Sequence, residues 1–410
     1  MKILISGAGI AGPCLAFWLR SYGFEPTLIE HSPSLRRGGY VVDFWGAGFD
    51  VAERMGLLPE ILANGYKVRE LRVVDRRGHR ASGFDVKALD RVTHGRYTSL
   101  SRSDLAASIY RALGDRVETV FGDSITEIED AGHEVRVRFE RSAARSFDLV
   151  VGADGLHSRV RTLAFGSDDR FERFLNMKVA AFEAKGYRPR DELAYVVHRD
   201  VGRQVGRFSM RNDETMFLFV LADDSPEIPR GLDEQRALLR EQFWHSGWEC
   251  RNMLAALDHS DDLYMDRVSQ IRASRWTRGR LALVGDAAYC VSLLAGQGSA
   301  LAMVGAYILA GELHRANGDH RLAFASYENR LRPVITSKQS AAIKLTSFFA
   351  PRSRFGMWVG NQVMKLMAIP FVTELAIGRE LRDSIELPAY ATSDQVSRHG
   401  EAAGTENASV

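Results

Sequence analysis

A glycine-rich run near the amino end carries the clearest chemical signal in this sequence, Gly7-Ala8-Gly9-Ile10-Ala11-Gly12. Glycines at this spacing, between a strand and a helix, are typical of a site for the pyrophosphate of a dinucleotide. Gly7 permits a tight turn, Gly9 lets a phosphate approach the backbone, and Gly12 lets the helix pack closely on the strand. Free N–H groups at the helix start complement phosphate charge, so Ile10 and Ala11 are candidate ligands as well.

An acidic residue follows at a suitable distance. Glu30 ends the next apolar run, 18 positions after Gly12, where a carboxylate can accept hydrogen bonds from the hydroxyls of an adenosine ribose. The same carboxylate would repel a 2′-phosphate. His31, directly after Glu30, is a further candidate contact to the cofactor.

Two later segments each place a glycine and an aspartate after an apolar strand pattern, at Asp154-Gly155 and at Gly285-Asp286. A carboxylate at a strand end can bond a ribityl hydroxyl, and N–H groups at the next helix start can stabilise negative charge on a reduced flavin. The two segments therefore favour FAD over NAD as the bound dinucleotide. The residues that open this next helix are Gly298, Ser299 and Ala300.

In order and separation, the three motifs resemble those of the single-component, group A FAD-dependent aromatic hydroxylases. This family is represented by para-hydroxybenzoate hydroxylase and includes the tetracycline-inactivating monooxygenases. The resemblance covers roughly residues 1–320. It implies that the first motif holds the ADP part of FAD, that Asp154-Gly155 touches both FAD and NAD(P)H, and that Gly285-Asp286 holds the ribityl chain. Further cofactor contacts that the resemblance implies are Arg102, Arg36 or Arg37, and Asp43.

One stretch departs from the family. After Gly-Asp-Ala-Ala the family usually has a histidine and, a few residues on, a proline, whereas this chain has Tyr289, Cys290, Val291 and Ser292. Proline would stiffen a loop beside the flavin. The departure therefore concerns the loop conformation and the mobility of the ring, and it leaves Asp286 in place.

The motifs need a strand, a helix and a second strand at the start of the chain, and the sequence predicts them at 2–6, 13–22 and 25–30. Alternating segments at 195–198, 204–210 and 216–221, with Asn212-Asp213 at a turn, predict an inserted antiparallel sheet. We therefore expect an α/β protein: a Rossmann-type FAD-binding domain with a βαβ opening, an inserted, mostly antiparallel substrate-binding sheet, and C-terminal helices. The expected boundaries are 1–75, 95–171 and 272–340 for the FAD-binding domain, 76–94 and 172–271 for the sheet domain, 341–391 for the helices and 392–410 for a disordered tail.

Apolar side chains alternate along two of the predicted sheet strands and are candidates to line a substrate pocket, although half of any such set must face the other way. These candidates are Phe208, Met210, Phe217 and Phe219. Catalytic residues stay unassigned, because His157, Tyr289 and Arg207 are each more often structural in such positions. A late aromatic stretch could cover the substrate or pack a dimer, and it comprises Phe348, Phe349, Phe355 and Trp358.

The resemblance implies that NAD(P)H reduces FAD, that O2 forms a flavin C4a-hydroperoxide, and that the substrate takes the distal oxygen. The expected substrate is a small aromatic or polyketide-like molecule of secondary metabolism, and hydroxylation, epoxidation and Baeyer–Villiger insertion all stay open. Other readings are a prenyl-chain reductase, a halogenase, or a non-catalytic flavin- or ligand-binding protein. Halogenases carry W-x-W-x-I-P, and the spacing of Trp244 and Trp248 differs from it.

Composition narrows the partners. A formal net charge of +2 over 410 residues gives no reason to expect nucleic acid or an anionic membrane as partner. Three separated cysteines and 11 unclustered histidines predict neither a disulfide framework nor a metal site. The most apolar late stretch, 357–377, is interrupted by Lys365, Pro370 and Glu374, so no membrane span is expected. Without a secretory signal after Met1, we expect a cytoplasmic monomer or homodimer whose partners are its substrate, O2 and NAD(P)H.

Overall fold

A six-stranded sheet organises the amino-terminal part of the computed structural model, which describes residues 1–36, 40–260, 262–366 and 385–390. The strand order is β17-β18-β11-β1-β2-β7, and all neighbours are parallel except β17 and β18. Its central strands are apolar and buried on both faces, as expected of a parallel sheet covered by helices. The strands are β1 (Lys2–Ser6), β2 (Glu25–Glu30), β7 (Glu118–Phe121), β11 (Leu149–Gly152), β17 (Thr277–Arg278) and β18 (Leu281–Leu283).

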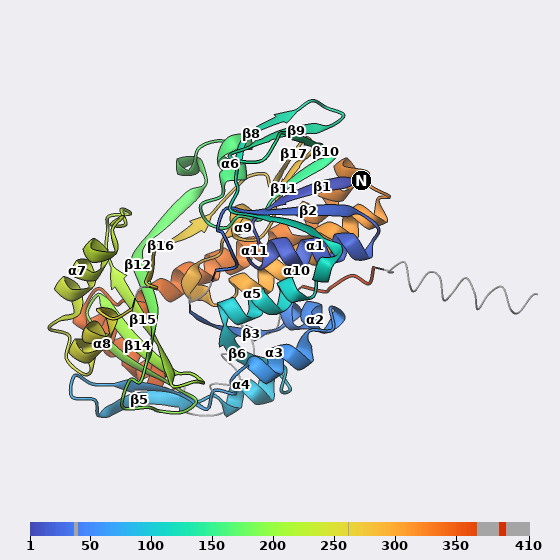
Figure 1. The fold of residues 1–410 in the computed structure, drawn as a ribbon. Coiled ribbons are helices and arrows are strands. Elements are labelled where there is room, and N and C mark those ends of the chain that lie inside the picture. Colours follow the sequence, from blue (N-terminus) through green and yellow to red (C-terminus); the bar gives the residue numbers. More distant parts are fainter. Residues whose placement is uncertain (37–39, 261, 367–384, 391–410) are drawn as a thin grey trace, which may run out of the picture.

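Helices and two small sheets surround this core (Figure 1). The predicted βαβ opening is confirmed, with its helix α1 running through Ala11–Ser21 and packing on the long α10, Gly298–Arg315. The other helices of this part are α2 (Ala47–Arg54), α3 (Leu58–Asn64), α4 (Lys87–Val92), α5 (Arg102–Arg111), α6 (Arg159–Ala164) and α9 (Asp286–Tyr289). The small sheets pair β3 (Val41–Trp45) with β6 (Tyr97–Ser101), and β8 (Ile125–Asp130) with β9 (Val135–Phe139) and β10 (Arg145–Phe147).

The predicted insertion is a seven-stranded sheet ordered β16-β12-β15-β14-β13-β4-β5, antiparallel except between β13 and β4. The predicted turn at Asn212-Asp213 joins β14 to β15, and both residues have positive φ, as a tight two-residue hairpin requires. Residues 70–74, expected in the FAD-binding part, form β4 of this sheet because they pair with β13 and β5. The strands are β4 (Glu70–Val74), β5 (Arg80–Asp85), β12 (Glu172–Lys185), β13 (Ala194–Asp200), β14 (Arg203–Ser209), β15 (Glu214–Ala222) and β16 (Tyr264–Ile271).

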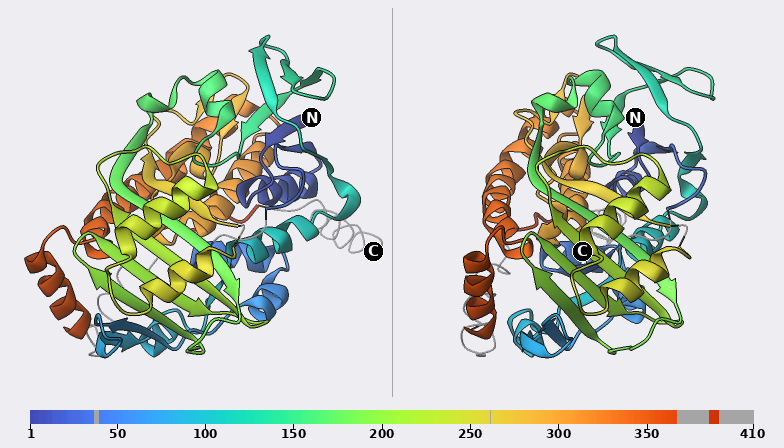
Figure 2. Two further views of the ribbon diagram at one scale, coloured as in Figure 1. Left: turned by 60° about the vertical axis from the view of Figure 1, so that its left-hand side comes forward. Right: turned by 90° about the vertical axis from the view of Figure 1, so that its left-hand side faces the viewer.

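The two faces of this sheet pack against different layers (Figure 2). Helices α7 (Leu232–Phe243) and α8 (Cys250–Leu257) cover the outer face and form an apolar cluster with it. The inner face packs on β3, β6 and the short 3-10 turn η3 (Leu293–Ala295), all of which belong to the FAD-binding part. Any ligand held between the two parts therefore meets the inner face.

The chain continues into α11 (His320–Phe349) and α12 (Arg354–Leu366), as expected for carboxy-terminal helices. Residues 385–390 return to the first domain, where Tyr390 donates to buried Glu312 at 2.6 Å and Arg54 donates to the carbonyl of Pro388. The expected disordered tail, 392–410, lies outside the described residues. Among the residues described, no helix has both the length and the hydrophobicity to cross a membrane.

Candidate functional site

The three glycine motifs meet at one edge of the six-stranded sheet, because each follows the carboxyl end of a parallel strand and the strands are neighbours in the order β18-β11-β1. A Cβ on Gly7, whose φ is +106°, would lie 2.6 Å from the carbonyl oxygen of Ala153. A Cβ on Gly285 would lie 3.0 Å from the Cβ of Ala11. Residues separated by more than 270 positions thus form one cradle.

The first motif has the shape that a pyrophosphate needs. A Cβ on Gly12 would lie 1.9 Å from the carbonyl oxygen of Gly7, so only glycine fits there. Among the residues that the structure describes, a Cβ on Gly9 would meet nothing closer than the Arg102 guanidinium, at 3.8 Å, so these residues leave room above Gly9. Ile10, at the start of α1, makes no side-chain capping bond and the first turn holds no acid. The start of α1, at Ile10 and Ala11, therefore suits an anion.

Glu30 is held rigidly at the end of β2. Its two oxygens accept from the backbone N–H groups of Ala8, at 2.8 Å, and Ser32, at 2.9 Å. Burial alone would raise its pKa, but these bonds and nearby Arg36 outweigh burial and lower the pKa of Glu30. The charged carboxylate suits a ribose diol. His31 is exposed with its ring 3.5 Å from Glu30, and Arg36 donates to Ser32 Oγ, so both lie at the Glu30 end of the site. Arg37 lies outside the described residues.

Asp154 caps a helix in addition to any contact with the cofactor. Its carboxylate accepts from the Ser158 hydroxyl and from the N–H groups of Arg159 and Val160, at 2.9 and 3.1 Å, at the start of α6. Burial raises the pKa of Asp154. Gly155 has φ +81°, and no described residue comes within 4 Å of where its Cβ would be, so the described part of the chain leaves this turn accessible to a ligand.

Arg161 connects the second and third motifs, and sequence reasoning missed it. Its side chain is fully buried and donates to the carbonyl oxygens of Leu156, at 2.6 Å, and Ala287, at 2.9 Å, and to Asp168, at 2.7 Å. A strongly basic residue inside the helix directly after the Asp-Gly turn was the available signal. Arg161 therefore fixes the distance between the Asp154-Gly155 loop and α9.

Asp286 begins α9, 3.6 Å from the position of a Cβ on Gly298. Burial raises the pKa of Asp286, and the positive charge of Arg102 acts in the opposite direction. The first turn of α10, with Gly298, Ser299 and Ala300, contains no acid and its N-cap makes no side-chain bond. The arrangement offers a carboxylate for a hydroxyl-rich chain and a positive helix end for an electron-rich ring edge.

Asp43 has a different environment from the other cofactor candidates. It accepts from the hydroxyls of Ser99, at 2.6 Å, Tyr97, at 2.8 Å, and Tyr195, at 3.4 Å. Burial raises the pKa of Asp43 against these bonds. Because Tyr195 lies on β13, this carboxylate joins the FAD-binding part to the seven-stranded sheet.

The four substrate-pocket candidates separate onto opposite faces of the sheet. Phe208 and Met210 face inward and pack with Tyr66 and Tyr97. Phe217 and Phe219 face outward, where they pack with Phe243, Leu254 and other side chains of α7 and α8. Strand alternation is the reason, because Phe208 lies opposite Met216 in the register and residue 217 points the other way. The nomination of Phe217 and Phe219 is therefore not retained.

The residues considered for direct chemistry lie in three different places. Arg207 faces outward and pairs with Asp191 and Glu249, so it lies away from the cradle. Tyr289 is buried in the core of the FAD-binding part, and the Cys290 thiol donates to the carbonyl of Ser269. His157 is exposed beside the cradle, with Nε2 3.0 Å from Asp266 of β16. The Asp266 carboxylate raises the pKa of His157.

Ligand-type atoms of His157, Asp168 and Glu172 lie within 4.8 Å of one another. Arg161 pairs with Asp168 and Arg267 pairs with Glu172, so both carboxylates are already neutralised and the group does not form a strong cation site.

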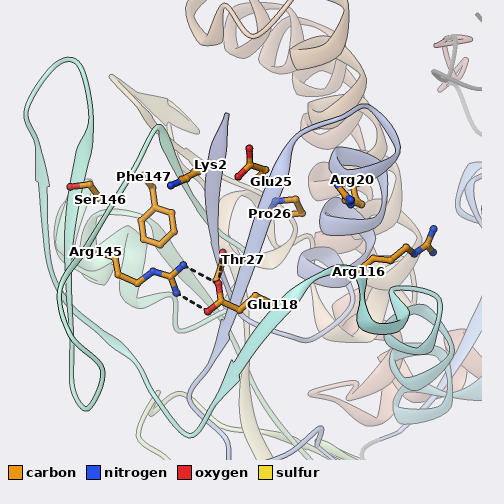
Figure 3. Close-up of a pocket in the computed structure, with 10 residues that line it drawn as sticks. All are labelled: Lys2, Arg20, Glu25, Pro26, Thr27, Arg116, Glu118, Arg145, Ser146 and Phe147. Atoms are coloured by element: carbon orange, nitrogen blue, oxygen red, sulfur yellow. Dashed lines mark hydrogen bonds and ion pairs between the residues drawn. The ribbon is translucent and has the colours of Figure 1, made fainter.

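A cavity of about 430 Å³ lies at the opposite edge of the six-stranded sheet, at the amino ends of β1 and β2 (Figure 3). Its central cation, Arg145, is held by Glu118 through two bonds of 2.9 Å and packs on the ring of Phe147. None of the glycine motifs reaches it. We therefore place the candidate site at the cradle and not in this cavity.

The chain matches the family model described as "FAD binding domain" over residues 1–338. It is 34% identical to a flavin-dependent monooxygenase from an unknown prokaryotic organism, with 95% of this chain and 99% of the relative covered. It is 33% identical to a flavin-dependent monooxygenase of Legionella longbeachae, with 96% and 99% covered. The crystal structure of tetracycline destructase Tet(55) superposes with a TM-score of 0.80 at 33% identity, over 95% of this chain and 98% of that one.

These matches agree with the geometry of the cradle, whose glycines, Glu30 and helix starts fit FAD. They also confirm the predicted fold and the family resemblance. The chain belongs to the FAD-binding-domain family of flavin-dependent monooxygenases.

Proposed function

We propose that this flavin-dependent monooxygenase uses NAD(P)H and O2 to hydroxylate, or otherwise oxygenate, a small aromatic or polyketide-like molecule. The main support is the inner face of the seven-stranded sheet, which is apolar and aromatic and packs on the FAD-binding part. Phe208, Met210 and Met216 pack against β3 and β6, and Val179 and Val220 pack against η3.

Leu218 is the centre of this proposed substrate surface. It is only partly buried and borders both inner clusters, so it lies where the two layers meet. In the register Leu218 pairs with Ala181, and Ala181 pairs with Tyr264. Tyr264 in turn faces Tyr40 of the FAD-binding part, with ring centroids 6.1 Å apart. A flat, apolar molecule fits this surface better than a charged one, since aromatic faces favour stacking.

The chain's own groups have separable tasks in this proposal. Gly9, Glu30, Asp286 and the start of α10 bind and orient FAD, which when bound supplies the redox and oxygen-activating chemistry. The apolar inner face orients the substrate and excludes water from the reacting atoms. His157, half-exposed beside the Asp-Gly loop, is accessible to a nicotinamide nucleotide that docks from solvent. The similarity to Tet(55) supports a polyketide-like substrate.

The test is oxygen consumption coupled to NAD(P)H oxidation by the FAD-loaded enzyme, with a panel of phenolic and polyketide compounds. We expect at least one compound to stimulate both rates together and to yield a product heavier by one oxygen atom. NADH and NADPH are compared in parallel. If NAD(P)H is oxidised while a double bond of the compound is reduced and no oxygen is taken up, the enzyme is a reductase. A dependence on halide would indicate the halogenase. Resistance of the bound FAD to reduction with every compound would indicate a non-catalytic binding protein.

A further inference from the structure

Helix α12 has an apolar outer face. Among the described residues, nine large apolar side chains are exposed, and five of these lie on this one helix. They are Phe355, Trp358, Val359, Val363 and Leu366. Their spacing of three and four residues places them on one stripe of a helix. An isolated exposed apolar residue is ordinary, but a contiguous group of five marks a surface that binds something.

The inner face of the same helix is already occupied. Gly360 and Met364 are buried on the side opposite the stripe, and α12 contacts β5 and α11. A Cβ on Gly360 would lie 3.1 Å from the guanidinium of Arg199, so the helix backbone is seated closely on the sheet domain. The apolar outer stripe is therefore not needed to hold the helix in place. Figure 2 shows α12, in dark orange-red, at the margin of the molecule.

The charges of α12 are all positive. Arg354 and Lys365 are exposed, and the helix contains no Asp or Glu. The two cations are eleven positions, or about three helical turns, apart, so they lie along the same edge of the apolar stripe. Phe355 and Trp358 stack with ring centroids 6.0 Å apart. An apolar stripe with a cationic edge and a tryptophan is the composition of a helix that lies in a membrane interface.

From this arrangement we infer that α12 docks the enzyme on the surface of an anionic lipid bilayer, with the apolar stripe in the headgroup region and Arg354 and Lys365 against lipid phosphates. The charge pattern disfavours a second copy of the chain as the occupant. In an antiparallel two-fold pairing of α12 with itself, equal edges meet, so Arg354 of one copy would face Lys365 of the other. The near-neutral charge of the whole chain had given no reason to expect an anionic membrane, because the total averages over this local pattern.

The experiment is co-sedimentation of the FAD-loaded enzyme with two kinds of vesicle, phosphatidylcholine alone and phosphatidylcholine mixed with phosphatidylglycerol. We expect binding to the mixed vesicles, weaker binding to phosphatidylcholine, and loss of binding as salt screens the charges. The double variant Trp358→Asp/Val363→Asp is expected to lower the partition coefficient at least about tenfold, because it puts two charges into the stripe. The matched control is Leu322→Asp on α11, an equally exposed apolar residue elsewhere, which is expected to bind like the wild type.

Retained FAD absorbance and an unchanged melting temperature show that the variants are folded. A second measurement uses a conservative variant. Subtracting the emission spectrum of Trp358→Phe from that of the wild type gives the emission of Trp358, which should shift to shorter wavelength when mixed vesicles are added. Absence of wild-type binding to the mixed vesicles would overturn the inference, as would equal binding of the double variant. If the wild type does not bind vesicles but forms a dimer that the double variant does not form, the apolar stripe binds a second copy of the chain. If a soluble quencher cannot reach Trp358 in the monomer and the enzyme does not bind vesicles, the apolar stripe is covered by another part of this chain.

Discussion

Replacement of Gly9 by alanine tests whether the cradle holds a dinucleotide or is only a tight turn. Within the described part of the chain, the added methyl group would have no neighbour closer than 3.8 Å, and Gly9 is not among the glycines with positive φ. The fold therefore has no reason to lose stability. A gain of a few tenths of a kcal/mol, up to about 1, is expected because alanine restricts the unfolded chain.

The same methyl group would occupy the space that the cofactor's pyrophosphate needs. Displacing a phosphate from one or two backbone N–H groups costs about 1.5–3 kcal/mol for each charge-assisted bond. We therefore expect the Kd for FAD to rise by about 10- to 100-fold or more. Gly12→Ala is the contrasting variant, since its Cβ would lie 1.9 Å from the carbonyl oxygen of Gly7 and would force the backbone apart. That change should destabilise the apoprotein by more than about 2 kcal/mol.

Urea unfolding of the apoproteins and titration of FAD by fluorescence quenching measure the two effects separately. The expected pattern is a stable apoprotein with weak FAD binding for Gly9→Ala, and an unstable apoprotein for Gly12→Ala. Unchanged FAD affinity in Gly9→Ala would refute the placement of the pyrophosphate over this residue. A loss of apoprotein stability equal to that of Gly12→Ala would show that Gly9 is needed by the fold itself.

Three further predictions concern the surroundings of the site. Asp266 raises the pKa of His157, so the pair stabilises the fold fully below pH 6.5 and loses this effect as the pH rises through the higher pKa of the folded state. His157→Asn should therefore lower the melting temperature at pH 6 and match the wild type at pH 9. Arg161→Met removes the buried link between two motif loops, so it should lower the free energy of unfolding in urea by about 3 kcal/mol and weaken FAD binding. Arg161→Lys should be intermediate. Equal FAD affinity in the wild type and both variants would contradict this role. Phe217→Ala should lower the free energy of unfolding by about 3–5 kcal/mol and leave the KM for substrate unchanged. Leu218→Ala should change the KM with a smaller loss of stability. Equal changes in KM would contradict the assignment of the two faces.

Much of the candidate cofactor site could be predicted from local sequence, because a glycine motif between a strand and a helix is a local feature. Gly7, Gly9, Gly12 and Glu30 occupy the positions that their spacing predicts. The Gly-Asp pairs after β11 and β18 could also be placed, since both follow buried strands. The contact of Gly285 with Ala11 needed the strand order, which no local pattern contains.

Other parts could not be predicted because they depend on which groups meet across the fold. The sequence could not show that the Asp43 carboxylate would accept hydrogen bonds from three hydroxyls of β6 and β13. It could not show that buried Arg161 would connect two distant loops. Nor could alternation alone decide which of Phe208 and Phe217 faces the FAD-binding part. A period of two residues means that they point to opposite faces, but it does not say which layer covers each face.

The cofactor class, the βαβ opening and the presence of an inserted antiparallel sheet follow from the amino-acid sequence, because they depend on short patterns of glycine, acidic and apolar residues. Only the packing of the layers showed which side chains lie on the proposed substrate surface and which lie in the core beneath the outer helices. Burial and hydrogen-bond partners depend on which elements pack together, so no single stretch of sequence contains them. Leu218 and Phe217 are neighbours in the chain, yet Leu218 faces the layer of β3, β6 and η3, and Phe217 is core beneath α7 and α8.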